Sequence, residues 1–152
     1  MKKTLSVSLV LLLSSLSFAD VTTWRVKVPD AKGGQRKATL TFDDTKKVIE
    51  VLPAKGDAVD IPYEQIDKCS YEYTKKHRIT KGVLIAAVSP AAGIIVFLTK
   101  SRSHWLEFDY RDHEIPKVFV VRMDKREYLN ILDALKAHTG KEAEILGNAK
   151  KK

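Results

Sequence analysis

The chain has 152 residues, of which 44% are hydrophobic and 30% are charged, and its formal net charge is +8. This composition excludes a disordered polar chain, and the length fits a single domain. The only cysteine, Cys69, excludes an intramolecular disulfide, so the fold must be stabilised by a hydrophobic core. Cys69 lies in a strand-like segment, where we expect a small buried apolar group.

The first predicted element is a secretory signal peptide over residues 1–19. Two lysines precede an apolar run from Leu5 to Phe18, and a small-residue cleavage pattern ends at Ala19. The run is short for a spanning helix, which needs about 20 apolar residues, so cleavage is favoured over a membrane anchor. We therefore expect an exported, periplasmic protein. A basic exported protein meets anionic lipid before nucleic acid, so no nucleic-acid partner is predicted.

Residues 20–145 are predicted to form one mainly β domain. The period-two alternation of a half-buried strand recurs in seven segments. They are 24–28, 38–42, 48–52, 59–63, 66–74, 104–110 and 117–123. Short polar connections, such as that between 42 and 48, favour an antiparallel sheet that rolls up on itself.

One amphipathic helix is predicted at about 125–139. Its apolar residues recur at the spacing of one helix face, at Tyr128, Ile131, Leu132 and Leu135. We expect Asp124 to cap this helix, with Glu127 completing a capping box, and Gly140 to end it in the left-handed conformation. Residues 146–152 are predicted to be a flexible basic tail.

The element order resembles the pleckstrin-homology-like superfold over Trp24 to Gly140. The block HWLEFDYRDHEIPKVFVVRMDKREYLNILDALKAHTG is similar to the last two strands and capping helix of that fold. The resemblance implies an antiparallel roll or barrel capped by the helix, in a family of modules that bind lipids, peptides or proteins, usually without catalysis.

Phosphoinositide-binding members of that family carry a basic cluster in the loop after the first strand. The corresponding loop here contains Lys32, Arg36 and Lys37. The family's Lys-to-Arg-x-Arg spacing is missing, so no phosphoinositide pocket is predicted.

The segment 82–98 holds seventeen consecutive uncharged residues. As a helix it would extend roughly 25 Å, at the lower end of what crosses a hydrocarbon core of about 30 Å. The basic residues on its two flanks are nearly equal in number, which gives no orientation signal. A crossing would also separate strands of one sheet. We therefore predict an apolar hairpin insertion, with a turn at Ser89–Gly93 between arms 83–88 and 94–98.

Two interpretations of this hairpin stay open. In the first, it dips into a bilayer while its flanking cations lie at the headgroups, where each contributes about 1 kcal/mol. The residues predicted to contact the membrane are Lys75, Lys76, Arg78, Lys81, Val83, Leu84, Ile85, Pro90, Ile94, Ile95, Phe97, Lys100 and Arg102. The leading hypothesis is then a non-catalytic, membrane-associated binding or scaffolding module. In the second, the hairpin packs into the core of a soluble periplasmic domain that binds a peptide or protein.

A third hypothesis, from another class, is a small hydrolase. Its candidate residues are Asp109, Asp112 and His113, in the only dense cluster of potential ligands and bases. Their spacing matches no zinc or calcium motif, and the chain has no nucleophile elbow or phosphate-binding glycine loop. No catalytic residue, metal or cofactor is therefore predicted.

Overall fold

The structure is a computed structural model that describes residues 21–30, 34–79, 84–85 and 95–147. The predicted signal peptide, the Ser89–Gly93 turn of the apolar hairpin and the end of the predicted basic tail lie outside these residues.

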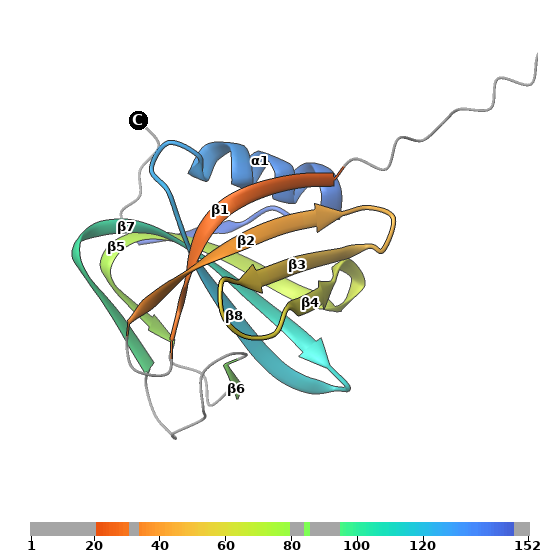
Figure 1. Cartoon of the computed structure of the whole chain (residues 1–152), viewed down its shortest axis with the longest axis horizontal. Coiled ribbons are helices and arrows are strands. Elements are labelled where there is room, and N and C mark those ends of the chain that lie inside the picture. The colour runs from red at the N-terminus through yellow and green to blue at the C-terminus, as the bar shows by residue number, and fades with distance from the viewer. Residues whose placement is uncertain (1–20, 31–33, 80–83, 86–94, 148–152) are drawn as a thin grey trace, which may run out of the picture.

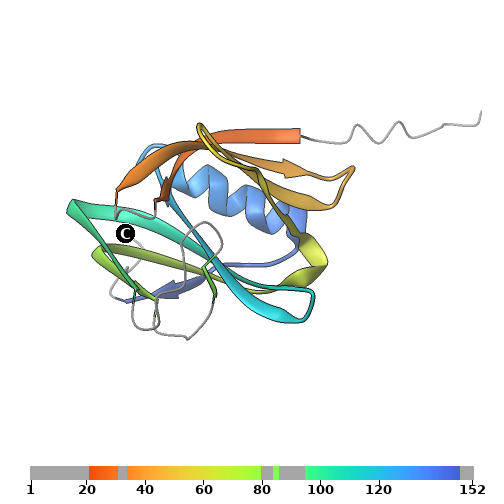
Figure 2. The same ribbon diagram turned by 60° about the horizontal axis from the view of Figure 1, so that its bottom comes forward.

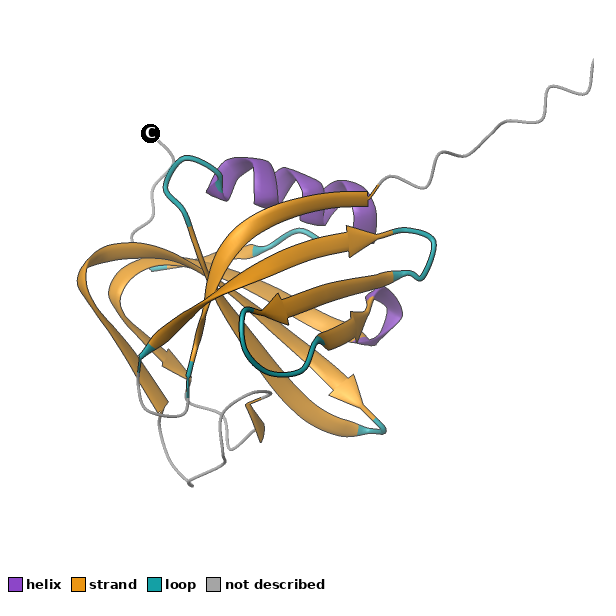
Figure 3. Ribbon diagram, viewed as in Figure 1, coloured by secondary structure: helices purple, strands orange, loops and turns teal. Residues whose placement is uncertain are grey.

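The described chain forms nine strands, one short 3₁₀ helix and one α-helix (Figures 1 and 3). In chain order these are β1 (Val21–Pro29), β2 (Gln35–Asp43), β3 (Val48–Pro53), β4 (Val59–Pro62), η1 (Tyr63–Gln65), β5 (Ile66–Ile79), β6 (Leu84–Ile85), β7 (Ile95–Asp112), β8 (Ile115–Met123), α1 (Tyr128–Thr139) and β9 (Glu144–Leu146). All seven predicted strands are present, although several extend beyond their predicted bounds.

The strands form one sheet in the order β4-β3-β2-β1-β8-β7-β5-β9, with β6 paired to β8. Strands β1 to β4 are an antiparallel meander, and the pair Lys27–Arg122 joins β1 to β8. The sheet curls round, and α1 lies across one end of the roll (Figures 1 and 2). The predicted fold class, a mainly β roll with one C-terminal helix, is confirmed.

The inner faces of the strands and one face of α1 bury the main core. Its largest fully buried members include Phe42, Leu40, Ile49, Ile61, Phe108, Phe119, Ile131 and Leu135. Cys69 is 2% exposed in this core, which confirms its prediction as a small buried group. Burial raises the pKa of its thiol to about 12.

A second apolar layer lies on the opposite face of β7 and β8. Trp105, Val118 and Val120 alternate with core residues along these strands, yet each is at most 2% exposed. The β7–β8 pair is therefore buried on both faces, which distinguishes it from the half-buried strands that the period-two pattern predicts.

The described parts of the apolar run belong to the sheet, while the turn of the predicted hairpin lies outside the described residues. Residues 95–98 pair with residues 76–79 of β5 in antiparallel register, and Leu84–Ile85 adds to β8 in parallel at Lys117–Val118. The described parts of the two arms therefore pair with other strands of the sheet. Because β5 and β7 are adjacent antiparallel strands, both flanks of the run belong to one sheet. No helix in the described part of the chain combines the length and apolarity that a membrane crossing requires.

The start of α1 also differs from the prediction. The helix begins at Tyr128, and Glu127 occupies the N-cap position without a side-chain capping hydrogen bond. The Asp124 carboxylate instead accepts the backbone N–H of Arg126 at 2.9 Å, so a turn precedes the helix where a capping box was expected. The predicted stop is confirmed, because Gly140 has φ 71° in the left-handed region.

A partly buried polar network holds the C-terminal end of α1 against the roll. His138 Nδ1 donates to Asp44 Oδ2 at 2.9 Å, and His138 Nε2 lies 2.9 Å from Thr22 Oγ1. Tyr63 donates its hydroxyl to the other oxygen of Asp44 at 3.1 Å, and the His138 ring stacks on Phe42. Burial alone would raise the pKa of Asp44, but the hydrogen bonds from His138 and Tyr63 outweigh it and lower the pKa.

Candidate functional site

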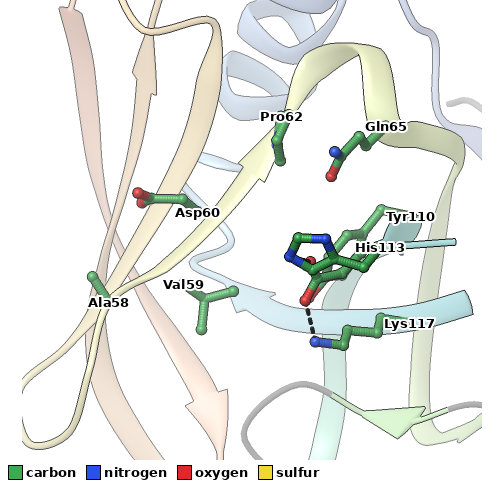
Figure 4. Close-up of a pocket in the computed structure, with 9 residues that line it drawn as sticks. Ala58, Val59, Asp60, Pro62, Gln65, Tyr110, His113 and Lys117 are labelled. Carbon is green, nitrogen blue, oxygen red and sulfur yellow. Dashed lines mark hydrogen bonds and ion pairs between the residues drawn. The ribbon is translucent and has the colours of Figure 1, made fainter. Parts of the chain in front are cut away.

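A groove separates β4 from the β7–β8 hairpin on the open side of the roll (Figure 4). Its volume is about 490 Å³. It is lined by Ala58, Val59, Asp60, Pro62, Gln65, Tyr110, Asp112, His113 and Lys117. One wall is thus the last strand of the first meander, and the other is the tip of the hairpin made by the last two long strands.

The hairpin wall is built on a strained two-residue turn. Asp112 pairs with Ile115, so His113 and Glu114 alone connect β7 to β8. Their φ values are 49° and 63°, the left-handed conformation that such turns require and that glycine or asparagine usually supplies. The turn places the His113 ring at the rim of the groove with 94% of the side chain exposed. Strain of this kind persists where the surrounding structure enforces it, often at functional sites.

Two ionisable groups of the groove, Asp112 and Tyr110, have shifted pKa values. Lys117 Nζ donates to Asp112 Oδ2, and this hydrogen bond lowers the pKa of Asp112. Tyr110 is 4% exposed, and its burial raises the pKa of the phenol to about 12. Neither shift moves its group towards the neutral range in which a general base or a tyrosine nucleophile works.

The other wall of the groove is an edge strand. β4 is one of the two terminal strands of the sheet order, the other being β9, and it pairs only with β3 among the described residues. It is only four residues long, and such short strands are common at the edges of sheets. The Asp60 side chain is exposed, and it points away from Tyr110 and His113 on the opposite wall (Figure 4). The register sets Asp60 directly opposite Glu50 of β3.

The three residues of the hydrolase hypothesis are only partly brought together. Asp112 and His113 line the groove, with 3.6 Å between His113 Nε2 and Asp112 Oδ1. Asp109 lines a separate hollow of about 200 Å³ beside Lys68. Within the described ranges, no three His, Cys, Asp or Glu side chains are grouped as a metal site would require.

The residues predicted to contact a membrane fall into three groups. Lys75 and Arg102 are exposed, and the Arg102 guanidinium lies 5.9 Å from the centre of the Tyr73 ring. The second group lies in paired strands, namely Lys76, Arg78, Leu84, Ile85, Ile95, Phe97 and Lys100. The third lies outside the described residues and comprises Lys81, Val83, Pro90 and Ile94. Their contact with a membrane stays a prediction.

Sequence reasoning did not single out the β4 wall as part of a site. The segment 59–63 was predicted as a strand from its alternation alone. Pro62 at its end does not mark it as an edge strand, because the interior strands β1 and β3 also end in proline, at Pro29 and Pro53.

Comparison with known proteins gives a fold likeness. No family model matches the chain, and no curated protein matches it. Seven chains of solved structures match. One belongs to a structure described as the Spt16D Pob3N heterodimer, with a TM-score of 0.51, 9% sequence identity and 88% of this chain covered. The chain spans 60% of the length of that matched chain. At this identity the likeness concerns the fold alone.

Proposed function

We propose that this protein is a non-catalytic binding module that receives an extended segment of a partner protein in the groove beside β4. The observation that carries the proposal is the placement of the groove between an edge strand and a hairpin tip. An edge strand offers unpaired backbone N–H and C=O groups, and an added strand satisfies them with main-chain hydrogen bonds. The groove then supplies pockets for alternate side chains of the bound segment.

The size and lining of the groove support this proposal. A volume of about 490 Å³ falls within the range of about 300–1,000 Å³ that is usual for binding sites. Apolar side chains such as Val59, Pro62 and Tyr110 are combined with a few fixed polar groups, including the Lys117–Asp112 pair. The pKa of Asp112 is lowered and that of Tyr110 is raised, so neither group titrates near neutral pH.

The fold likeness agrees with a binding role. The resemblance to the pleckstrin-homology-like superfold implies a module for lipids, peptides or proteins. The matched structure is that of a heterodimer, in which such a chain has a protein partner. These comparisons support a protein partner without identifying one.

The proposal can be tested with synthetic ten-residue peptides that alternate valine with lysine, glutamine or glutamate. The three versions sample extended segments of different charge. We expect at least one of them to shift the backbone amide resonances of Val59, Asp60 and Ile61 and to slow amide exchange on the free edge of β4. The resonances of Asp133, on the exposed face of α1, serve as the control and should not move.

A proline variant sharpens this test. Successive residues of a strand direct their N–H groups to opposite edges, so either Val59 or Asp60 presents its N–H to the free edge. Proline at that position removes the donor while the ladder with β3 is kept. We expect only one of the two variants, Val59→Pro or Asp60→Pro, to unfold at the same temperature as the parent protein. That variant should no longer bind the peptides. Peptide binding that persists in this variant, or shifts confined to other surfaces, would refute strand addition at β4.

A second candidate function is contact of an exported, periplasmic form with an anionic membrane through the apolar run. What supports it is the pairing of β5 with β7, which places Ile79, just before the run, beside Ile95 within it. The exposed cations Lys75 and Arg102 lie on the same two strands. We expect the protein to float with vesicles containing phosphatidylglycerol, and Arg102→Glu to weaken flotation relative to Lys136→Glu. Equal flotation with purely zwitterionic vesicles would argue against the electrostatic contact. N-terminal sequencing of the periplasmic fraction should begin at Asp20.

A further inference from the structure

Two carboxylates lie side by side at the free edge of the sheet. The register pairs Asp60 of β4 directly with Glu50 of β3, and both residues face away from the core. Residues paired in this way have Cβ atoms roughly 4.5–5.5 Å apart, and like charges at this position are destabilising. The sheet therefore carries a local repulsion at the strand to which a partner would add.

The two carboxylates differ in how their charge is compensated. Glu50 lies 3.9 Å from the ammonium of Lys46. The Asp60 side chain has no hydrogen bond or ion pair with any described residue. The other carboxylate that lines the groove, Asp112, is paired with Lys117. Asp60 is thus the uncompensated charge on the edge strand, in a chain whose net charge is +8.

We infer that the bound segment carries a lysine or arginine at the position paired with Asp60. This inference rests on the proposed function, because it takes strand addition to β4 as its premise. An added strand places one residue beside Asp60 at the same short spacing that separates Asp60 from Glu50. A cation there attracts Asp60 and offsets its repulsion from Glu50, whereas a carboxylate adds a third like charge to the row.

The charge of Asp60 also disfavours pairing between two copies of this chain. Two copies of this chain that met through their β4 edges would bring two Asp60 side chains to the same side of a shared sheet. Edge strands commonly avoid such self-association with charged side chains and short length. The Asp60 carboxylate therefore disfavours self-pairing and favours a basic segment from another protein.

The test uses the full chain with the lysine, glutamine and glutamate versions of the valine-alternating peptide. Binding is measured by titration of the Val59 and Ile61 amide resonances. We expect the lysine peptide to bind about two- to fivefold more tightly than the glutamine peptide, and the glutamate peptide to bind most weakly. The ratio should fall towards one in high salt, because Asp60 is exposed.

Variants of Asp60 and Asp133 test whether the Asp60 side chain causes the preference for the lysine peptide. Asp60→Asn should remove the preference for lysine while the glutamine peptide still binds, and Asp60→Lys should shift it towards glutamate. Asp133→Asn, which changes another exposed carboxylate, on α1, should leave the preference intact. If all three peptides bind with equal affinity, or if Asp60→Asn keeps the preference, the inference is wrong and strand addition still stands. If none of the peptides shifts the β4 resonances, strand addition fails and the inference falls with it.

Discussion

Replacement of Asp44 by alanine tests whether the polar network at the end of α1 stabilises the fold. Asp44 lies in the turn between β2 and β3 and accepts hydrogen bonds from His138 of α1 and Tyr63 of η1. His138 is in turn joined to Thr22 near the start of β1. The carboxylate therefore links the turn, the helix and η1, and its removal disconnects them together.

The expected loss follows from the two donors that the substitution leaves behind. The side chain of His138 is 7% exposed and Tyr63 is 7% exposed, so water reaches neither group freely. A buried donor without a partner costs about 1–3 kcal/mol. Asp44→Ala should therefore lower the free energy of unfolding by about 2–4 kcal/mol, with some relief from water, because the Asp44 side chain itself is 28% exposed. Asp44→Asn keeps one acceptor oxygen and should lose about half as much.

The assay is urea unfolding followed by far-ultraviolet circular dichroism, with Asp133→Ala as the control. Asp133 is exposed on α1, where such a change should cost less than about 0.5 kcal/mol. The pH dependence supplies a second readout. The pKa of Asp44 is lower in the folded state than the unfolded value of about 3.9, so its contribution is complete above that value and is lost as the pH falls through the folded pKa.

Asp44→Asn should therefore show a smaller loss of stability than the parent protein when the pH is lowered from 5 to 2. Two results would refute the reasoning. The first is an Asp44→Ala variant as stable as Asp133→Ala. The second is an acid dependence that Asp44→Asn leaves unchanged, which would mean that the carboxylate is not stabilised as an anion in the fold.

Three further predictions concern other buried groups. Burial raises the pKa of Cys69 to about 12, so iodoacetamide at pH 8 should modify the native thiol at least about a hundredfold more slowly than the urea-unfolded thiol, and similar rates would contradict its burial. Trp105→Ala should lower the free energy of unfolding by about 3–5 kcal/mol in urea melts, while Tyr73→Ala, at a residue 42% exposed, should cost far less. Burial lowers the pKa of His104, whose ring centre lies 3.9 Å from that of Tyr128, so an NMR titration should give this histidine a pKa below 6.5. The free energy of unfolding should fall as the pH drops below about 6.5, because the histidine of the unfolded state binds a proton at higher pH than that of the folded state.

The fold was predictable because most strands are buried on one face only. Segments such as 38–42 and 48–52 show clean alternation, and they became β2 and β3 with few changes at their ends. The helix face was equally clear, since Ile131 and Leu135 are both fully buried. In these elements the periodicity of the sequence and the burial in the structure have the same physical cause.

Element bounds could not be predicted from the sequence in segments where apolar residues recur with no regular period. The start of β7 and the short strand β6 lie in the apolar run and could not be predicted, because a stretch without polar residues shows no alternation between a buried and an exposed face. Strand β9 pairs with β5 through only three residues of a polar tail. At the start of α1, the sequence fits a capping box, yet Asp124 uses its carboxylate one residue earlier, on Arg126.

The candidate site was hidden for a different reason. Its two walls come from segments about fifty residues apart, and no motif connects Val59 or Asp60 with His113. The sequence pattern indicated Asp112 and His113 only as potential catalytic groups. In the structure, Asp112 forms an ion pair with Lys117, and His113 lies at the rim of the groove. The pairing of Asp60 with Glu50 depends on strand register, which alternation alone does not fix across a turn.

The apolar run and the groove are physically connected through Lys117. Its backbone pairs with Leu84 of the run, while its ammonium binds Asp112 on the hairpin wall of the groove. The run also begins beside the second buried layer, because Ile85 pairs with Val118. A substitution that detaches β6 from β8 should therefore move the resonances of Lys117 and Asp112 as well as those of the run. Since the two candidate functions share this strand, a change in membrane contact caused by such a substitution is informative only when the groove is monitored in the same sample.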